Sequence, residues 1–124
     1  MTNVLTPKEQ TKIYDPEERT ARFGENIILL CKKIPQNPIT QRLIPQLIGA
    51  GTSVGANYCE ADDAESKKDF RHKICICKKE SRESKHFLRM INVAAPELQE
   101  EAKTFWQEAK ELNLIFNSIY SRLK

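Results

Sequence analysis

Several features that other classes of protein need are missing from the sequence. It has no run of about 18 consecutive apolar residues, as a membrane-spanning helix requires, and residues 1–14 lack the apolar core of a secretory signal. Glycine and proline are scarce, with 4 and 6 in 124 residues, which disfavours a turn-rich β-sandwich. Hydrophobic residues make up 40% and charged residues 30%, so the composition is not that of a disordered chain. We therefore expect one helical domain in a soluble, cytoplasmic protein.

The four cysteines fit neither a zinc ribbon nor a secreted disulfide framework, because their spacing is irregular and their neighbours are small or apolar. They are Cys31, Cys59, Cys75 and Cys77. On a helix, Cys75 and Cys77 would be rotated by about 200° from each other and could not share a metal ion. We expect free thiols that act as small hydrophobic side chains.

The first helix is predicted to begin at residue 16. Residues 1–15 show no periodicity and read as a flexible lead-in, so the bundle is expected to cover residues 16–124. The run Asp15-Pro16-Glu17-Glu18 has an N-cap residue, a proline at the first helical position and acids in the first turn. Apolar residues then repeat at helical spacing until the prolines at 35 and 38: Phe23, Ile27, Leu30, Cys31 and Ile34.

A second helix, opening at Asn37 or Thr40, is rich in small residues. Pro45 lies near its first turns, where a missing N–H does least harm. Each interior glycine costs about 1 kcal/mol relative to alanine, so some packing gain must compensate. Gly51 and Gly55 are four residues apart and share a face, where we expect another helix backbone to approach closely. The stretch does not resemble a phosphate-binding loop, since no Gly-Lys-Ser/Thr follows and no strand precedes it.

Two longer helical patterns complete the chain. Ser66 and Asp69 resemble a capping box that opens the third helix. Its stripe follows an unbroken heptad with a small, polar centre, for which we expect hydrogen-bonded or close packing: Phe70, Ile74, Cys77, Ser81, Ser84, Leu88 and Ile91. Pro96 is expected near the start of the fourth helix, whose stripe steps by 4 and 3: Leu98, Ala102, Phe105, Ala109, Leu112, Phe116, Ile119 and Leu123. The pattern predicts an all-α, antiparallel up-down-up-down four-helix bundle.

Large apolar residues also fall outside these stripes, on faces that a lone bundle would leave in contact with water. They are Ile76, Phe87, Met90, Trp106, Leu114 and Ile115. So many large apolar side chains outside the core favour a subunit interface over scattered exposure.

Positive charge is concentrated in the third helix. Residues 66–92 carry nine Lys or Arg and three Asp or Glu, whereas the whole chain has a formal net charge of only +3. Six of these cations lie within about 60° of one another on the helical wheel, and we call them the basic stripe: Lys67, Arg71, Lys78, Arg82, Lys85 and Arg89. The stripe suits the backbone of RNA or DNA, bound by phosphate contacts without base readout. It has no interleaved aromatic residues on which single-stranded bases could stack.

The basic stripe also has an alternative role that involves no nucleic acid. The cations of the basic stripe can instead be neutralised by acids on an adjacent helix or subunit, namely Glu97, Glu100, Glu101, Glu108 and Glu111. For Asn57 and Glu60 we expect a buried polar cluster facing the third helix near Lys79 and Arg82, which would fix helix register.

Catalytic chemistry has little support. Glu83 and His86, like Asp69 and His72, have the Glu-x-x-His type of spacing of di-iron bundles. However, the two histidines are about 21 Å apart along one helix, and the chain has no others. No serine has a histidine and an acid at a spacing that predicts a nucleophile. We expect no enzyme activity, catalytic residue, metal or cofactor.

The middle of the chain resembles a known family. Its most specific part, residues 46–91, contains Gln46-Leu47, Ala50-Gly51-Thr52-Ser53-Val54-Gly55-Ala56-Asn57, Glu60-Ala61, Ser66-Lys67, Asp69-Phe70 and Lys79-Glu80-Ser81-Arg82-Glu83 through Leu88. These motifs are similar to those of small bacterial four-helix-bundle proteins encoded in intervening sequences of large-subunit rRNA genes. The accessory variability determinant protein of diversity-generating retroelements is a relative. Tyr58 and Cys59 depart from the smaller aliphatic residues common there.

The resemblance implies an assembly and a set of structural positions. It implies a homopentameric ring with no known catalytic activity. The retroelement member of the family is an accessory to a reverse transcriptase and itself contacts nucleic acid. The matching positions, expected to be structural, are Gly51, Ser53, Gly55, Asn57, Glu60, Asp69, Phe70, Lys79, Glu80 and Glu83. Together with the basic stripe, this suggests a nucleic-acid-associated accessory or scaffold. The alternative is an oligomeric scaffold that engages only a partner protein.

Overall fold

The computed structural model describes residues 15–123, which form four α-helices and one short 3-10 helix. The helices are α2 (Pro16–Lys33), α3 (Thr40–Asp62), α4 (Lys67–Ala94) and α5 (Gln99–Arg122), with η1 (Pro96–Leu98) between the last two. No strand is present in this part of the chain. The predicted all-α class with four helices is therefore correct. Apart from Asp15, the predicted lead-in of residues 1–15 lies outside the described residues.

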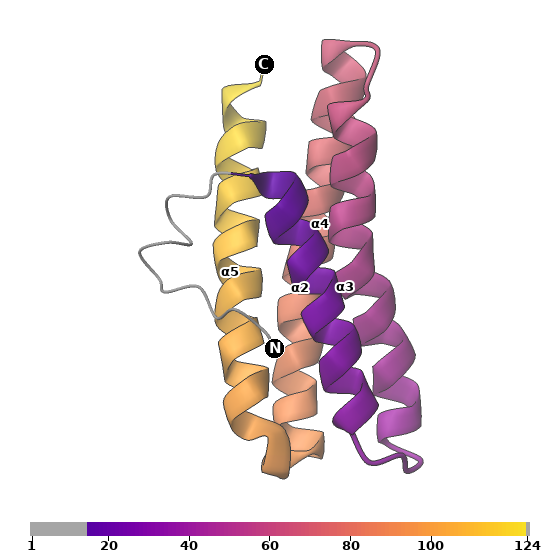
Figure 1. Ribbon diagram of the computed structural model, residues 1–124. Helices are drawn as coiled ribbons and strands as arrows, with labels where there is room; N and C mark the ends of the chain where they lie inside the picture. Colours follow the sequence, from indigo (N-terminus) through magenta and orange to yellow (C-terminus); the bar gives the residue numbers. More distant parts are fainter. Residues whose placement is uncertain (1–14, 124) are drawn as a thin grey trace.

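The four helices lie side by side as one bundle (Figure 1). The chain leaves each helix at one end of the bundle and returns along the next helix, as the colours in Figure 1 show. Helix α4 packs extensively against both α3 and α5, while α2 packs mainly on α3 and touches α5 less. The basic helix α4 is thus joined along its length to two neighbours, which determines what surrounds its cations.

Helix starts follow the capping chemistry of the sequence. Oδ1 of Asp15 accepts hydrogen bonds from the backbone N–H groups of Glu17 and Glu18, and Oγ of Ser66 accepts one from Asp69. Side-chain oxygens at these positions satisfy N–H groups that lack a partner within the helix. Pro96 differs from expectation in detail, since it opens η1 rather than the first turn of α5.

The predicted stripes form the core. Its largest fully buried side chains include Phe23, Leu47, Leu88 and Phe116. At the small, polar centre of α4, the hydroxyls of Ser81 and Ser84 are fully buried and donate to carbonyls of the preceding turn. Buried hydroxyls are costly without such partners, so the predicted hydrogen-bonded centre is present.

Glycines let α2 approach α3 closely, as the Gly51 and Gly55 spacing predicts. A Cβ placed on Gly51 would lie 2.9 Å from Cγ1 of Ile27, and one on Gly55 would lie 3.3 Å from Oγ1 of Thr20. Gly24 of α2 faces Thr52 in the same crossing. Here the family-signature glycines serve helix packing rather than backbone freedom.

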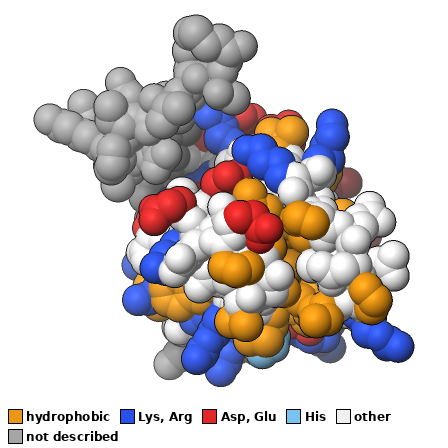
Figure 2. Space-filling model, turned by 90° about the horizontal axis from the view of Figure 1, so that it is seen from below, with side chains coloured by type: hydrophobic (Ala, Val, Ile, Leu, Met, Phe, Trp, Pro, Cys, Tyr) orange, Lys and Arg blue, Asp and Glu red, His pale blue; other side chains and the backbone are white. Residues whose placement is uncertain are grey.

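The apolar surface differs in part from the expectation. Trp106 and Phe87 are half-buried and pack against the core, while Leu114 is 55% exposed. The most exposed large apolar side chains are Val93 at 77% and Ile39 at 65%. Figure 2, which views the bundle from below, shows hydrophobic side chains gathered over the end where α2 joins α3 and α4 joins η1. Within residues 15–123, no helix is long and apolar enough to cross a membrane.

Candidate nucleic-acid interface

The basic stripe lies on the edge of α4 that borders α5. Lys67, Arg82 and Arg89 are exposed, whereas Arg71, Lys78 and Lys85 are half-buried. The difference follows from position, because the half-buried residues repeat every seventh position along the seam with α5. We call this surface, with the α5 residues described next, the α4–α5 face.

Tyr120 of α5 holds the first pair of cations. The guanidinium carbon of Arg71 is 3.9 Å from the centroid of its ring, and Nζ of Lys78 is 4.5 Å from the same centroid. Arg71 Nε also donates to the backbone carbonyl of Leu123. Nδ2 of Asn113 donates to the carbonyl of Lys78, 2.7 Å away, and so ties α4 to α5 at this level. Cation–π contacts of this kind are attractive and keep the side chains ordered.

Trp106 holds a second pair of cations further along α5. Nζ of Lys85 and Nζ of Lys110 lie 5.5 and 5.6 Å from the centroid of its ring. Trp106 also lines a shallow cavity of about 240 Å³, together with Arg89 and Lys103. Helix α5 therefore adds aromatic rings and further cations, Lys103 and Lys110, to the stripe.

The sequence reasoning missed these α5 residues. The basic stripe itself has no interleaved aromatic residue, as expected, but Trp106 and Tyr120 of the neighbouring helix lie beside it. The signal was present in the spacing of Lys103, Trp106, Lys110, Asn113 and Tyr120, which step by 3, 4, 3 and 7 and so share one face of a helix.

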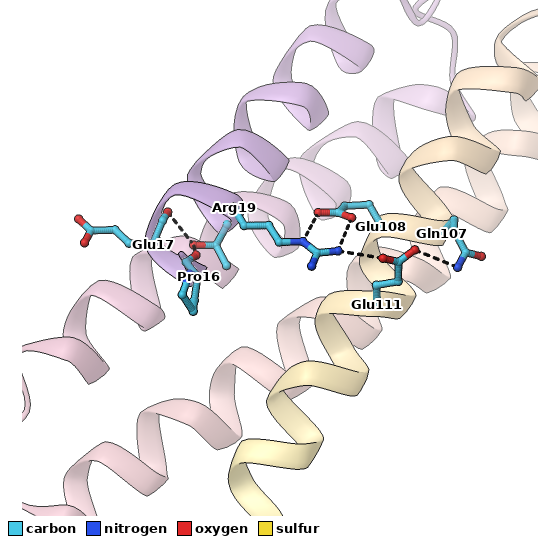
Figure 3. Close-up of polar contacts among 7 residues, drawn as sticks. Pro16, Glu17, Arg19, Gln107, Glu108 and Glu111 are labelled. Carbon is cyan, nitrogen blue, oxygen red and sulfur yellow. Dashed lines mark hydrogen bonds and ion pairs between the residues drawn. The ribbon is translucent and has the colours of Figure 1, made fainter. Parts of the chain in front are cut away.

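Three of the five glutamates that were expected as partners of the basic stripe pair with α2 instead, whereas Glu97 of η1 and Glu100 of α5 make no ion pair among the described residues. Arg19 of α2 contacts both oxygens of Glu108 at 2.8 Å and Glu111 at 2.9 Å (Figure 3). Lys33 of α2 pairs with Glu101 at 2.9 Å. Among the described residues of one chain, no cation of the basic stripe takes part in an ion pair. The acids of α5 therefore lie on its α2 side, whereas Lys110 lies beside the basic stripe and Lys103 borders both sides.

The α2 side of α5 forms an open groove of about 500 Å³ that Arg19 bridges. The hydrogen bonds to Glu108 raise the pKa of Arg19, although burial of the guanidinium opposes the shift. With its side chain only 21% exposed, Arg19 is held in a bidentate, charge-assisted contact of the strong kind. Arg19 of α2 thus pairs with acids of α5 inside this groove, and the groove offers no surplus of positive charge.

The expected cluster of Asn57 and Glu60 is wrong in its partners. Asn57 Nδ2 donates to the carbonyl of Ser53 in its own helix, and Glu60 forms an ion pair with Lys73 at 2.8 Å, with the Glu60 side chain 56% exposed. The short connection between α3 and α4 sets this register. It places the end of α3 beside the start of α4, so Lys79 and Arg82 lie level with an earlier part of α3.

The remaining signature positions occupy the α3 side of α4 or its outer surface. Phe70 packs against the core, while Lys79 and Glu83 are exposed. Burial raises the pKa of the Glu80 carboxyl, and the neighbouring Glu83 carboxylate raises it further. The acids of α4 thus lie away from the basic stripe, which sharpens the charge asymmetry of this helix.

The cysteines and histidines form no common site. All four cysteines are free, with Cys31 and Cys77 buried, Cys75 half-buried and Cys59 exposed. Burial raises the pKa of Cys31 to about 11 and that of Cys77 to about 12, so both thiols stay protonated and unreactive. Within residues 15–123, no group of three or more His, Cys, Asp or Glu residues is placed to hold a metal ion.

Comparison with known proteins places the chain in a family. The family described as "23S rRNA-intervening sequence protein" matches residues 14–118. The chain belongs to this family. A solved structure from Bacteroides thetaiotaomicron VPI-5482, described as a protein with unknown function from the S23 ribosomal protein family, has a TM-score of 0.75 and 25% sequence identity. The match covers 86% of this chain and 98% of that one. Among curated proteins, none matches significantly.

The family shown by this match is the one that the motifs of residues 46–91 resemble. The match begins at residue 14, next to Asp15, the N-cap of α2. The α4–α5 face lies almost entirely within the matched residues, since only Tyr120 and Leu123 come after residue 118.

Proposed function

We propose that the protein binds the phosphate backbone of RNA or DNA through the α4–α5 face and acts as a non-enzymatic accessory or scaffold. The observation that carries the proposal is the uncompensated charge of this face. The basic stripe makes no ion pair among the described residues, and Lys110 of α5 joins it over the Trp106 ring. Clustered cations without paired acids attract a polyanion and release its counterions on binding.

The ordering of the cations supports the same role. Arg71, Lys78 and Lys85 are positioned by the rings of Tyr120 and Trp106. Long basic side chains lose rotamer entropy when they bind, and cations that are already held lose less of it. Their N–H groups can then contact phosphates without base readout.

We further propose that the antiparallel bundle works as a homo-oligomer, with the pentameric ring that the resemblance implies. Support comes from exposed apolar side chains, namely Ile28, Leu29, Ile39, Val93 and Leu114, since exposed apolar surface marks interfaces. A ring would repeat the basic stripe in every subunit and strengthen the local positive potential. The molar mass of the purified protein, measured by light scattering, tests this assembly.

The alternative function is a scaffold that engages a partner protein, such as a reverse transcriptase, and no nucleic acid. The exposed apolar end of the bundle favours it. In that case, acids of a neighbouring subunit or of the partner would neutralise the basic stripe. Nucleic-acid binding would then be absent even at low salt.

The deciding experiment is fluorescence anisotropy with a structured RNA and a duplex DNA between about 50 and 200 mM salt. We expect affinity to fall steeply with salt. The double variant Arg82→Glu/Arg89→Glu changes two exposed cations of the stripe and should weaken binding about 10-fold or more. It should also reduce the salt slope by about 0.9 for each phosphate that the variant no longer neutralises.

A matched control separates a specific face from net charge. Lys32→Glu/Arg42→Glu makes the same charge change on exposed residues of α2 and α3 and should alter affinity less than 3-fold. Equal weakening by both variants, or no binding by the wild type at 50 mM salt, would contradict the proposed function.

A further inference from the structure

The basic stripe forms a straight row whose length matches a structural repeat of duplex nucleic acid. Arg89 lies 22 positions after Lys67 in one unbroken helix, so the row is about 33 Å long at 1.5 Å per residue. The three cations at the α5 seam, Arg71, Lys78 and Lys85, are seven residues apart and therefore about 10.5 Å from one another. A B-form DNA duplex repeats its two backbones about every 34–36 Å, with grooves roughly 12 and 6 Å wide between them.

The aromatic rings beside this row are already occupied. Tyr120 has Arg71 and Lys78 within 4.5 Å of its ring centroid, and Trp106 has Lys85 and Lys110 within 5.6 Å. Both residues also pack against the hydrophobic core. A nucleobase could stack on either ring only by displacing a cation that would otherwise bind phosphate.

This arrangement lacks what single-strand binding uses. Proteins that bind single strands combine a basic groove with open aromatic faces, on which successive bases stack. Stacking a base here would cost cation–π contacts of comparable strength, so little net stabilisation would remain. A duplex needs no stacking platform, because its bases are already paired and its phosphates are held in a rigid, repeating array.

We infer that the α4–α5 face is built for double-stranded nucleic acid, with the basic stripe lying along about one helical turn and contacting phosphates only. The inference rests on the proposed function and specifies the class of its ligand. The 34–36 Å repeat is that of B-form DNA, whereas an RNA duplex is A-form, with a deep, narrow major groove and a wide, shallow minor groove. Both present regularly spaced phosphates, and the contacts named here make no distinction between bases.

The test compares a 24-base-pair duplex with each of its two separated strands, as DNA and as RNA, by anisotropy at about 100 mM salt. We expect the duplex to bind at least 10-fold more tightly than either strand. A hairpin with a 6-base-pair stem offers only about 20 Å of duplex, at 3.4 Å per pair. It should bind at least 10-fold more weakly than the 24-base-pair duplex, because it cannot reach the whole row.

The variant Trp106→Leu reports on stacking. It removes the ring that positions Lys85 and Lys110 but keeps every cation, so it should weaken duplex and single-strand binding by the same factor, within about 2-fold. Helical content and thermal melting, followed by circular dichroism, establish that the variant is folded. A second variant, Lys110→Gln, removes one cation from the same ring and should weaken duplex binding about 2- to 5-fold.

Two kinds of failure can be told apart. If the single strands bind as tightly as the duplex, or if Trp106→Leu lowers single-strand affinity at least 5-fold more than it lowers duplex affinity, the duplex inference is overturned while the proposed function stands. If neither duplex nor strands bind at 50 mM salt, the proposed function is wrong and the duplex inference falls with it.

Discussion

Gly51 lies where α3 crosses α2, and replacing it with alanine tests the packing on which the bundle depends. The added Cβ would lie 2.9 Å from Cγ1, 3.0 Å from Cγ2 and 3.1 Å from Cβ of Ile27. Carbon atoms in favourable contact are about 3.5–4.0 Å apart. Because Cβ of Ile27 is itself among the close atoms and the residue is fully buried, a change of rotamer cannot relieve the overlap. The two helices would have to separate.

The magnitude follows from two opposing terms. Alanine improves helix propensity over glycine by about 1 kcal/mol, whereas overpacking a dense core costs about 1–3 kcal/mol. We expect Gly51→Ala to change the free energy of unfolding by about 0 to −2 kcal/mol. Gly49→Ala supplies the propensity gain alone, since nothing lies within 4 Å of its added Cβ. It should stabilise the protein by up to about 1 kcal/mol.

Urea unfolding followed by circular dichroism, at one fixed protein concentration, measures both variants against the wild type. The difference between Gly49→Ala and Gly51→Ala isolates the packing term, expected at about 1–3 kcal/mol. In an Ile27→Ala background, two of the three close atoms are gone, so Gly51→Ala should become less costly. Equal stabilisation by both glycine substitutions, with no coupling to Ile27, would refute the close-contact reasoning.

Two further substitutions test the electrostatics. Glu80→Gln should stabilise the protein by about 0.2–0.5 kcal/mol at pH 7, by relieving burial of a charge and repulsion from Glu83. Because the folded-state pKa of Glu80 is raised, its ionised carboxylate destabilises the folded protein at pH values above that pKa. This destabilisation fades as the pH falls towards the ordinary pKa of glutamate. Thermal melts that show the same gain for Glu80→Gln at pH 7 and at pH 4 would contradict this reasoning. Arg19→Gln should cost about 1.5–3 kcal/mol, because it breaks charge-assisted hydrogen bonds to Glu108. The exposed pair of Arg22 with Glu18 provides the control, and Arg22→Gln should cost less than about 0.5 kcal/mol; similar destabilisation of both variants in urea unfolding would count against the burial argument.

Much of the fold could be predicted from the sequence because local rules act within each helix. The caps at Asp15 and Ser66 and the buried polar centre at Ser81 and Ser84 depend on residues near one another in the chain. So does the close approach at Gly51, since a stripe of small residues leaves room for whichever helix packs there. These features need a helical period and residue size, but no knowledge of which helix is the neighbour.

The candidate site was predicted only in part. The basic stripe of α4 is visible in the sequence, but its partners are not. The cation–π partners Tyr120 and Trp106 come from another helix, and so does the pairing of Glu60 with Lys73. Such contacts depend on the relative register of two helices, which the length of the connection and the packing of the core determine together.

Four helices, their buried stripes and the concentration of cations on one edge of α4 follow from the sequence alone, because helical periodicity orders side chains around a single axis. Which residues surround those cations was decided only by how the helices pack together. Packing turned Glu101, Glu108 and Glu111 of α5 towards cations of α2. It left Lys110, Trp106 and Tyr120 of α5 beside the basic stripe. The physical reason is that burying the apolar stripe of α5 fixes the rotation of this helix about its axis. Its acidic edge then faces α2, and the edge that carries Lys110 faces α4.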